Sequence, residues 1–311
     1  MTRIDQGSQT LRADGLLLIT AVIWGFAFVA QRVGMEHVGP FGFNGVRFAL
    51  GCLTLLPLLY RNGARGADRR PDRAGEPWWS FSLGGGLLAG LVLFAGASFQ
   101  QVALVYTTAG NAGFITGLYV VLVPIIGIAL GHRTHAGTWT GVALAAVGLY
   151  LLSVVDRFTI SPGDLLVLIG AFFWAAHVHL IGWLSPRRDP LKIAFLQYAA
   201  CAALSLVVSA AVEQNTAERY LSAAIPILYG GVLSVGVAYT LQVVAQKNAK
   251  AAHAAIILSL EAVFAAIGGW LVLGETLTPR AFTGCALMLC GMLASQLWSA
   301  PSTIVPAAGD S

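Results

Sequence analysis

The chain has 311 residues, of which 57% are apolar and only 10% are charged, and its mean hydropathy is +0.76. This composition excludes an ordinary soluble domain and predicts an all-α integral membrane protein. The formal net charge of +4 comes from short charged intervals between apolar runs. We therefore interpret the basic residues as markers of membrane topology, and we expect no nucleic-acid partner.

Ten apolar runs follow one another along the chain, separated by short polar intervals. Each run has about 17 to 25 residues, which is long enough as a helix to cross about 30 Å of hydrocarbon. The expected transmembrane helices are 15–34, 41–60, 81–105, 109–130, 138–154, 163–184, 191–212, 222–246, 250–273 and 281–298. The first run lacks a small-residue cleavage site, so we expect a retained helix and not a signal peptide.

The distribution of Lys and Arg among the intervals predicts the orientation. An even number of spans places both termini on one side, and one set of alternate intervals carries thirteen basic residues against three in the other. Because basic residues concentrate on the cytoplasmic side, we predict a multi-pass protein with both termini in the cytoplasm. The excess of Arg over Lys, fifteen to three, and the abundance of Ala and Gly indicate a bacterial inner membrane. The tails 1–13 and 299–311 are expected to be cytoplasmic.

An internal repeat relates the two halves of the chain. We predict two five-helix copies at 14–155 and 163–298, and the odd number of helices inserts the second copy upside down. The matched pairs include Asp14 and Asp164, Trp24 and Trp174, Pro40 and Pro190, and Gln100 and Gln242. Inverted repeats are a usual construction of secondary transporters, with the substrate site near the bilayer midplane between the copies.

Two sequence stretches carry a family resemblance. One stretch is Asn111–Tyr119 (NAGFITGLY), and the other is Ser259–Phe264 (SLEAVF), which leads to Leu273-Gly274-Glu275. Both stretches resemble the EamA-type drug/metabolite transporters, and the resemblance covers essentially the whole chain. It implies two inverted five-helix repeats and a transport function, with export the commoner direction. The sequence departs from the family pattern at Gly131-His132-Arg133, where Gly-Glu is usual. It departs again at Ala262, where proline is common. Without that proline, the sequence does not establish that the ninth helix is kinked.

Polar and aromatic side chains within the spans are candidates for a transport path, because such groups are costly in lipid unless they are paired or line water. Helical spacing gathers several of them on shared faces. The predicted substrate-binding residues are Trp24, Phe28, Gln31, Asn111, Trp174, His177, Tyr239 and Gln242. The alternative for the two tryptophans is packing against lipid. Their depth of about ten residues within a span argues against an interfacial belt.

Charged residues inside the spans have two interpretations each. Arg47, whose repeat partner is the neutral Gln197, either extends its side chain to the outer membrane surface or pairs with a carboxylate in the cavity. Glu261 is either a structural helix contact or a cation or proton site, so both are possible charge or coupling residues. Asp14 and Asp164 are expected at helix starts, where a carboxylate complements the helix dipole.

The favoured function is a secondary transporter of small amphipathic metabolites, such as amino acids with apolar or aromatic side chains. We expect no enzyme activity, cofactor or metal site, and a monomer or weak homo-oligomer. One alternative is a membrane-embedded serine hydrolase, in which Ser98 of Gly96-Ala97-Ser98-Phe99 would use His253 as its base. The other is a non-transporting membrane scaffold. An ATP-driven pump is disfavoured because no phosphate-binding Gly-x-x-x-x-Gly-Lys-Ser/Thr motif occurs.

Overall fold

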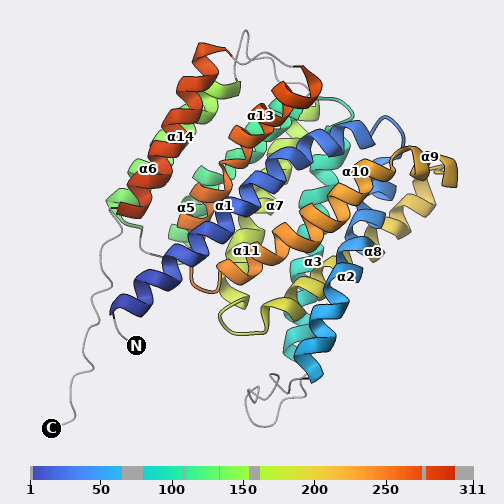
Figure 1. Cartoon of the computed structure of the whole chain (residues 1–311), viewed down its shortest axis with the longest axis horizontal. Coiled ribbons are helices and arrows are strands. Elements are labelled where there is room, and N and C mark those ends of the chain that lie inside the picture. Colours follow the sequence, from blue (N-terminus) through green and yellow to red (C-terminus); the bar gives the residue numbers. More distant parts are fainter. Residues whose placement is uncertain are drawn as a thin grey trace.

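The computed structural model describes residues 3–64, 80–107, 109–132, 134–153, 162–274 and 278–297. Every regular element in these ranges is a helix, so the all-α expectation is confirmed for this part of the chain (Figure 1). The first half contains α1 (Arg3–Gly34), α2 (Pro40–Ala64), α3 (Ser80–Ala103), α4 (Ala109–Gly117), α5 (Tyr119–Ala129) and α6 (Ala136–Ser153). The second half contains α7 (Pro162–Leu184), α8 (Pro190–Val212), α9 (Ala217–Ser222), α10 (Ala224–Leu228), the π-helix η1 (Tyr229–Tyr239), α11 (Thr240–Ala245), α12 (Ala251–Leu258), α13 (Glu261–Leu273) and α14 (Pro279–Leu297).

Eight stretches of the described residues are helical, long enough and apolar enough to cross a membrane. They are Gln9–Gly34, Pro40–Arg61, Leu83–Ala103, Ala112–Ala129, Pro162–Leu184, Pro190–Val212, Ala224–Ala245 and Ala251–Leu273. These stretches correspond to eight of the ten expected spans. The other two, 138–154 and 281–298, fall on α6 and α14, and the apolar part of α6, Ala136–Leu151, is shorter. Ten spans therefore remain a prediction.

Two of the expected spans are each divided into two helices. The span 109–130 breaks at Leu118, between α4 and α5, and the span 250–273 breaks at Ser259–Leu260, between α12 and α13. The second break forms although residue 262 is alanine, so no proline is needed there. The Ser259 hydroxyl donates a 2.8 Å hydrogen bond to the carbonyl oxygen of Ile256, which satisfies a backbone acceptor beside the break. Divided helices of this kind border the substrate sites of many transporters.

The expected span 222–246 is also irregular, because its central part is the π-helix η1. A π-helix of eleven residues is unusual, since most are single turns, and they occur frequently at functional sites. The segment packs closely on α2, and glycine permits the approach. A Cβ atom at Gly231 would lie 2.6 Å from the Cβ of Leu50. Small residues allow such backbone contacts between helices in lipid.

Two pairs of helices that are equivalent in the predicted repeat pack antiparallel. The carboxylate of Glu213, just after α8, accepts 2.8 Å hydrogen bonds from the amides of Phe41 and Gly42 at the start of α2. The first turn of α2 thus lies at the last turn of α8, and the two helices pack along their lengths. On α6 and α14, Gly141 approaches Gly291 and Gly148 approaches Gly284. Figure 1 shows α6 and α14 side by side.

The position of Asp14 differs from the expectation. Because α1 begins at Arg3, Asp14 lies eleven residues inside the helix rather than at its start. The end of an apolar run marks the limit of the expected span, but polar residues can continue the helix beyond it. Asp164 does lie in the first turn of its helix, α7. Its carboxylate accepts a 2.6 Å hydrogen bond from the Thr107 hydroxyl.

Candidate functional site

A small cavity lies between helices of both halves of the chain. Most of the predicted site residues line it, namely Trp24, Phe28, Gln31, Arg47, Trp174, Tyr239, Gln242 and Glu261. His177 lies beside the wall rather than in it. Its Nε2 is 2.8 Å from Oε1 of Gln197, and its ring contacts those of Trp174 and Tyr239. Asn111 belongs to α4, but its side chain is outside the described part of the chain.

The aromatic wall is organised around Tyr239, the last residue of η1. The centroid of its ring lies 4.5 Å from that of Trp24 and 6.1 Å from that of Trp174. The indole N–H of Trp24 donates a 3.3 Å hydrogen bond to the carbonyl oxygen of Ser234. Both indoles line the cavity, so the interpretation as lipid-packing residues does not describe them. The wall offers flat apolar surface with polar atoms at its edges.

An amide network joins three helices across the cavity. The indole N–H of Trp174 on α7 donates to Oε1 of Gln100 on α3 at 2.9 Å. The Nε2 group of Gln100 donates to Oε1 of Gln31 on α1 at 3.3 Å. Gln31 in turn donates to the carbonyl oxygen of Ala27 at 3.1 Å. A buried chain of this kind orients each side chain through the next, because an unpaired member would be costly.

Arg47 on α2 is buried beside the cavity instead of extending to a membrane surface. Its Nε donates a 3.0 Å hydrogen bond to Oδ1 of Asn44, and its guanidinium carbon lies 5.0 Å from the ring centroid of Phe48. Only 2% of the residue is exposed. The side chain has no carboxylate partner among the described residues. The side chain thus lines the cavity, but the carboxylate partner that one of the two alternatives required is not among the described residues.

Glu261 is the first residue of α13 and lies directly after the second helix break. Its carboxyl group lies beside the hydroxyl of Tyr119, the first residue after the first break. The two residues are 142 positions apart, the same offset that relates Gln100 to Gln242. Equivalent positions of the predicted repeat therefore meet at the cavity, one as a phenol and the other as a carboxyl group.

Three polar atoms at the cavity have no hydrogen-bond partner among the described residues, and all three belong to lining side chains. They are the Thr116 hydroxyl, the Tyr119 hydroxyl and Oε1 of Gln242. Buried polar atoms are normally paired, and exceptions are explained by function or by bound water or ligand. The cavity thus combines an aromatic wall, one cationic group, one carboxyl group and free hydrogen-bonding atoms.

Several lining residues were not selected from the sequence. They are Ala27, Gln100, Thr116, Tyr119, Val178, Ser234 and Leu258. A signal was present for Gln100, since it is the repeat partner of the selected Gln242. Tyr119 could have been found in the same way, since it is the repeat partner of the selected Glu261. The three apolar residues carried none, because nothing in their type separates them from ordinary packing residues.

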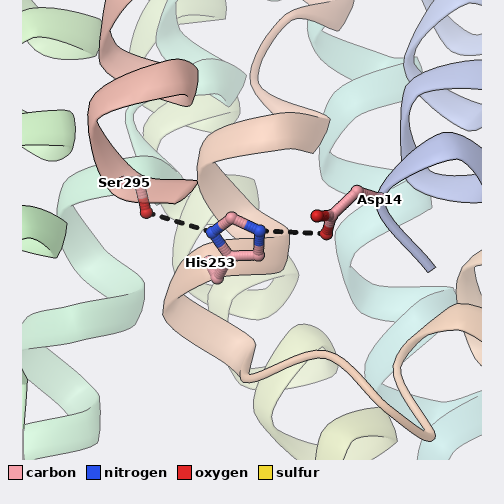
Figure 2. Close-up of polar contacts among 3 residues, drawn as sticks. All are labelled: Asp14, His253 and Ser295. Carbon is pink, nitrogen blue, oxygen red and sulfur yellow. Dashed lines mark hydrogen bonds and ion pairs between the residues drawn. The ribbon is translucent and has the colours of Figure 1, made fainter. Parts of the chain in front are cut away.

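The structure does not form the predicted Ser98–His253 pair. Figure 2 shows that His253 on α12 instead bridges two other helices. Its Nε2 lies 2.9 Å from Oδ1 of Asp14 on α1, and its Nδ1 lies 3.0 Å from the hydroxyl of Ser295 on α14. The cluster thus contains a serine, a histidine and an aspartate, but Ser295 is fully buried and none of the three residues lines the cavity. A serine nucleophile needs access to substrate. The cluster is therefore a contact between helices and gives the hydrolase no support.

The cluster predicts a stability effect. His253→Ala removes both hydrogen bonds and leaves Oδ1 of a buried aspartate without its histidine partner, which costs about 1–3 kcal/mol. We expect a lower midpoint of thermal unfolding for the purified protein in detergent. His37→Ala is the matched control, since His37 is exposed. Equal midpoints for the two variants would show that the cluster does not stabilise the helix contact.

Comparisons with known proteins agree with this architecture. The model of the EamA-like transporter family matches residues 11–154 and again residues 161–295. A protein of Archaeoglobus fulgidus named "Uncharacterized transporter" is 36% identical over 94% of this chain and 88% of its own length. An Escherichia coli protein named "Probable amino-acid metabolite efflux pump" is 28% identical over 53% of this chain and 52% of its own. One crystal structure shares the fold, with a TM-score of 0.69 and 19% identity over 94% of this chain and 97% of that chain.

Proposed function

The chain belongs to the EamA-like transporter family, and on this basis we propose that it is a secondary transporter that opens the central cavity alternately to the two sides of the membrane. The observation that carries the proposal is the cavity itself. It lies between helices of the two family matches and is lined by polar and aromatic side chains from both. Polar groups so deep in apolar helices are costly unless they serve a path for solute.

We further propose ten transmembrane helices arranged as two inverted repeats, 14–155 and 163–298. The double match of the family model supports the repeat. The antiparallel packing of α2 against α8 and of α6 against α14 supports the inversion, because equivalent helices of inverted copies run in opposite directions. The equivalent breaks at Leu118 and Leu260 support it as well.

The proposed solutes are small amphipathic metabolites, with amino acids as the first class to test. The aromatic wall suits an apolar or aromatic side chain, and the polar groups suit a charged backbone. Export is the proposed direction, and the name of the E. coli relative is in keeping with it. The proposed location is the inner membrane, where another E. coli relative is named an inner membrane transporter. We propose cytoplasmic termini and a monomer or weak homo-oligomer.

Counterflow in proteoliposomes tests the function. Vesicles loaded with unlabelled amino acids should accumulate labelled amino acid from outside, and protein-free vesicles should not. Trp174→Ala removes an aromatic wall residue and should lower the initial rate about tenfold or more. Trp183→Ala is the matched control, since Trp183 is on the same helix but 46% exposed. Equal rates for the two variants would contradict the site, and absence of flux for any solute would contradict the transporter.

A further inference from the structure

The predicted repeat makes most of the cavity symmetric. Trp24 and Trp174 are equivalent, and both line it. Gln100 and Gln242 are equivalent, and both line it. A wall built from equivalent residues presents similar chemistry from both copies. It follows that the positions where the copies differ decide which ligands the cavity distinguishes from one another.

The two copies differ in charge at two positions of the cavity. Arg47 has the neutral Gln197 as its equivalent, and Glu261 has the neutral Tyr119. One copy therefore contributes a cationic group and the other a carboxyl group. Gln197 does not line the cavity but contacts His177 at 2.8 Å. The departures from symmetry place a guanidinium at one position of an otherwise neutral aromatic chamber and a carboxyl group at another, and these two groups are called its poles below.

Among the residues that the structure describes, Arg47 and Glu261 form no ion pair with each other or with a third residue. Asn44 binds the guanidinium through Nε, and the terminal NH2 groups form no hydrogen bond with the described residues. Tyr239 lines the cavity together with both residues. Buried charges without an ion-pair partner are costly, so a ligand that pairs with them gains much of its affinity there.

We propose that Arg47 and Glu261 are the specificity-determining pair of the cavity, with Arg47 binding the carboxylate and Glu261 binding the ammonium group of a zwitterionic α-amino acid. The guanidinium offers a planar set of donors that matches a carboxylate. The side chain of the ligand would contact Trp24, Trp174 and Tyr239. This inference rests on the proposed transport function and narrows its substrate class.

Net charge explains why a zwitterion is favoured over an anion or a cation. A zwitterion pairs with both poles and leaves the loaded cavity neutral. A carboxylic acid pairs with Arg47 but leaves Glu261 without a partner, and an amine does the reverse. Either singly charged ligand also adds net charge to a site enclosed by apolar helices, where charge is disfavoured.

A ligand series on the purified protein tests the inference. Binding of the twenty L-amino acids is measured by isothermal titration calorimetry in detergent. For the tightest ligand, the measurement is repeated with its amide, which keeps only the ammonium group, and with its deaminated acid, which keeps only the carboxylate. We expect both analogues to bind at least about 30-fold more weakly, since a buried charge loses its partner in each case.

Two variants assign the poles. Arg47→Gln introduces the glutamine that the other copy has at the equivalent position, Gln197. This variant should lose the preference for the zwitterion over the amide. Glu261→Gln should remove the preference over the deaminated acid. A merely structural role would weaken binding of all three ligands equally, so this crossed pattern separates recognition from folding. Gel filtration and the thermal midpoint check that each variant is folded.

Several outcomes overturn the inference. They are analogues that bind the wild-type protein as tightly as the amino acid, the absence of binding by any L-amino acid, or equal losses for all ligands in a folded variant. If a variant does not fold, the affinities of the wild-type protein for the amino acid, its amide and its deaminated acid still test the inference. The proposed transport function and the proposed binding of a zwitterion can fail separately. Counterflow of a solute that is not a zwitterion would support transport and contradict the zwitterion site. Loss of all flux rejects the proposed function.

Discussion

Replacing Gly25 by alanine is expected to destabilise the protein and to abolish counterflow. Gly25 lies where α1 meets α13, and a Cβ atom there would be 2.7 Å from the carbonyl carbon of Phe264 and 2.8 Å from the amide nitrogen of Ala265. Because these are backbone atoms, α13 itself would have to move. Overpacking of this kind costs about 1–3 kcal/mol or more. The movement would separate Trp24 from Glu261, which lie on these two helices beside the cavity.

Gly15→Ala is the matched control for this substitution. Gly15 belongs to the same helix, and a Cβ atom there would meet nothing within 4 Å. Alanine favours a helix over glycine by about 0.5–1 kcal/mol, so this variant should unfold at the same temperature as the wild type or slightly above it. The thermal midpoint in detergent and the counterflow rate are the measurements. Wild-type values for Gly25→Ala would contradict the close contact of α1 and α13.

Replacing Gln100 by leucine is expected to stop counterflow while the protein still folds. Gln100 accepts from the indole of Trp174 and donates to Gln31. Leucine has a similar volume but leaves a buried donor and a buried acceptor unpaired, each at a cost of about 1–3 kcal/mol. The Trp174 indole and the Gln31 amide would reorient to find other partners. Two walls of the cavity would change shape together.

A double-mutant cycle separates this network from general destabilisation. Trp174→Phe removes the indole donor, so the loss caused by Gln100→Leu should be smaller in that background. The binding free energy of the tightest amino-acid ligand is the quantity to compare. Strictly additive losses would show that the hydrogen bond between Trp174 and Gln100 does not position the wall. Loss of folding in both single variants would show that the network is needed for stability rather than for the shape of the site.

The membrane helices and several cavity residues follow from the sequence for simple reasons. Apolar runs of sufficient length predict helices in lipid, and eight of the ten runs coincide with described helices that are long and apolar enough to cross it. Trp24, Trp174 and Tyr239 were selected because aromatic groups deep in a span need an explanation. Arg47 and Glu261 were selected because charge in a span is costly. All five lie at the cavity.

The interruptions of the helices could not be predicted in this way. The residues of the breaks, Leu118 and Ser259–Leu260, are neither proline nor glycine. Gly117 directly precedes the first break, but Gly127 and Gly268 lie inside unbroken helices, so glycine alone does not mark a break. The breaks depend on packing between distant segments, as the contact of Tyr119 with Glu261 illustrates. The partner of His253 was also missed, because Asp14 lies 239 residues away along the chain. Helical spacing within one span gives no information about contacts of that range.

The α6–α14 pair contributes none of the residues that line the cavity. Its contact surface is instead a seam of glycines, where Gly148 of one helix lies against the backbone of Gly284 of the other. The lining of the cavity and the fit of this seam are thus encoded in separate parts of the polypeptide. Mutational drift could alter the chemistry of the chamber and leave the seam untouched. Such modularity would let a single scaffold acquire new cargo without rebuilding its outer helices.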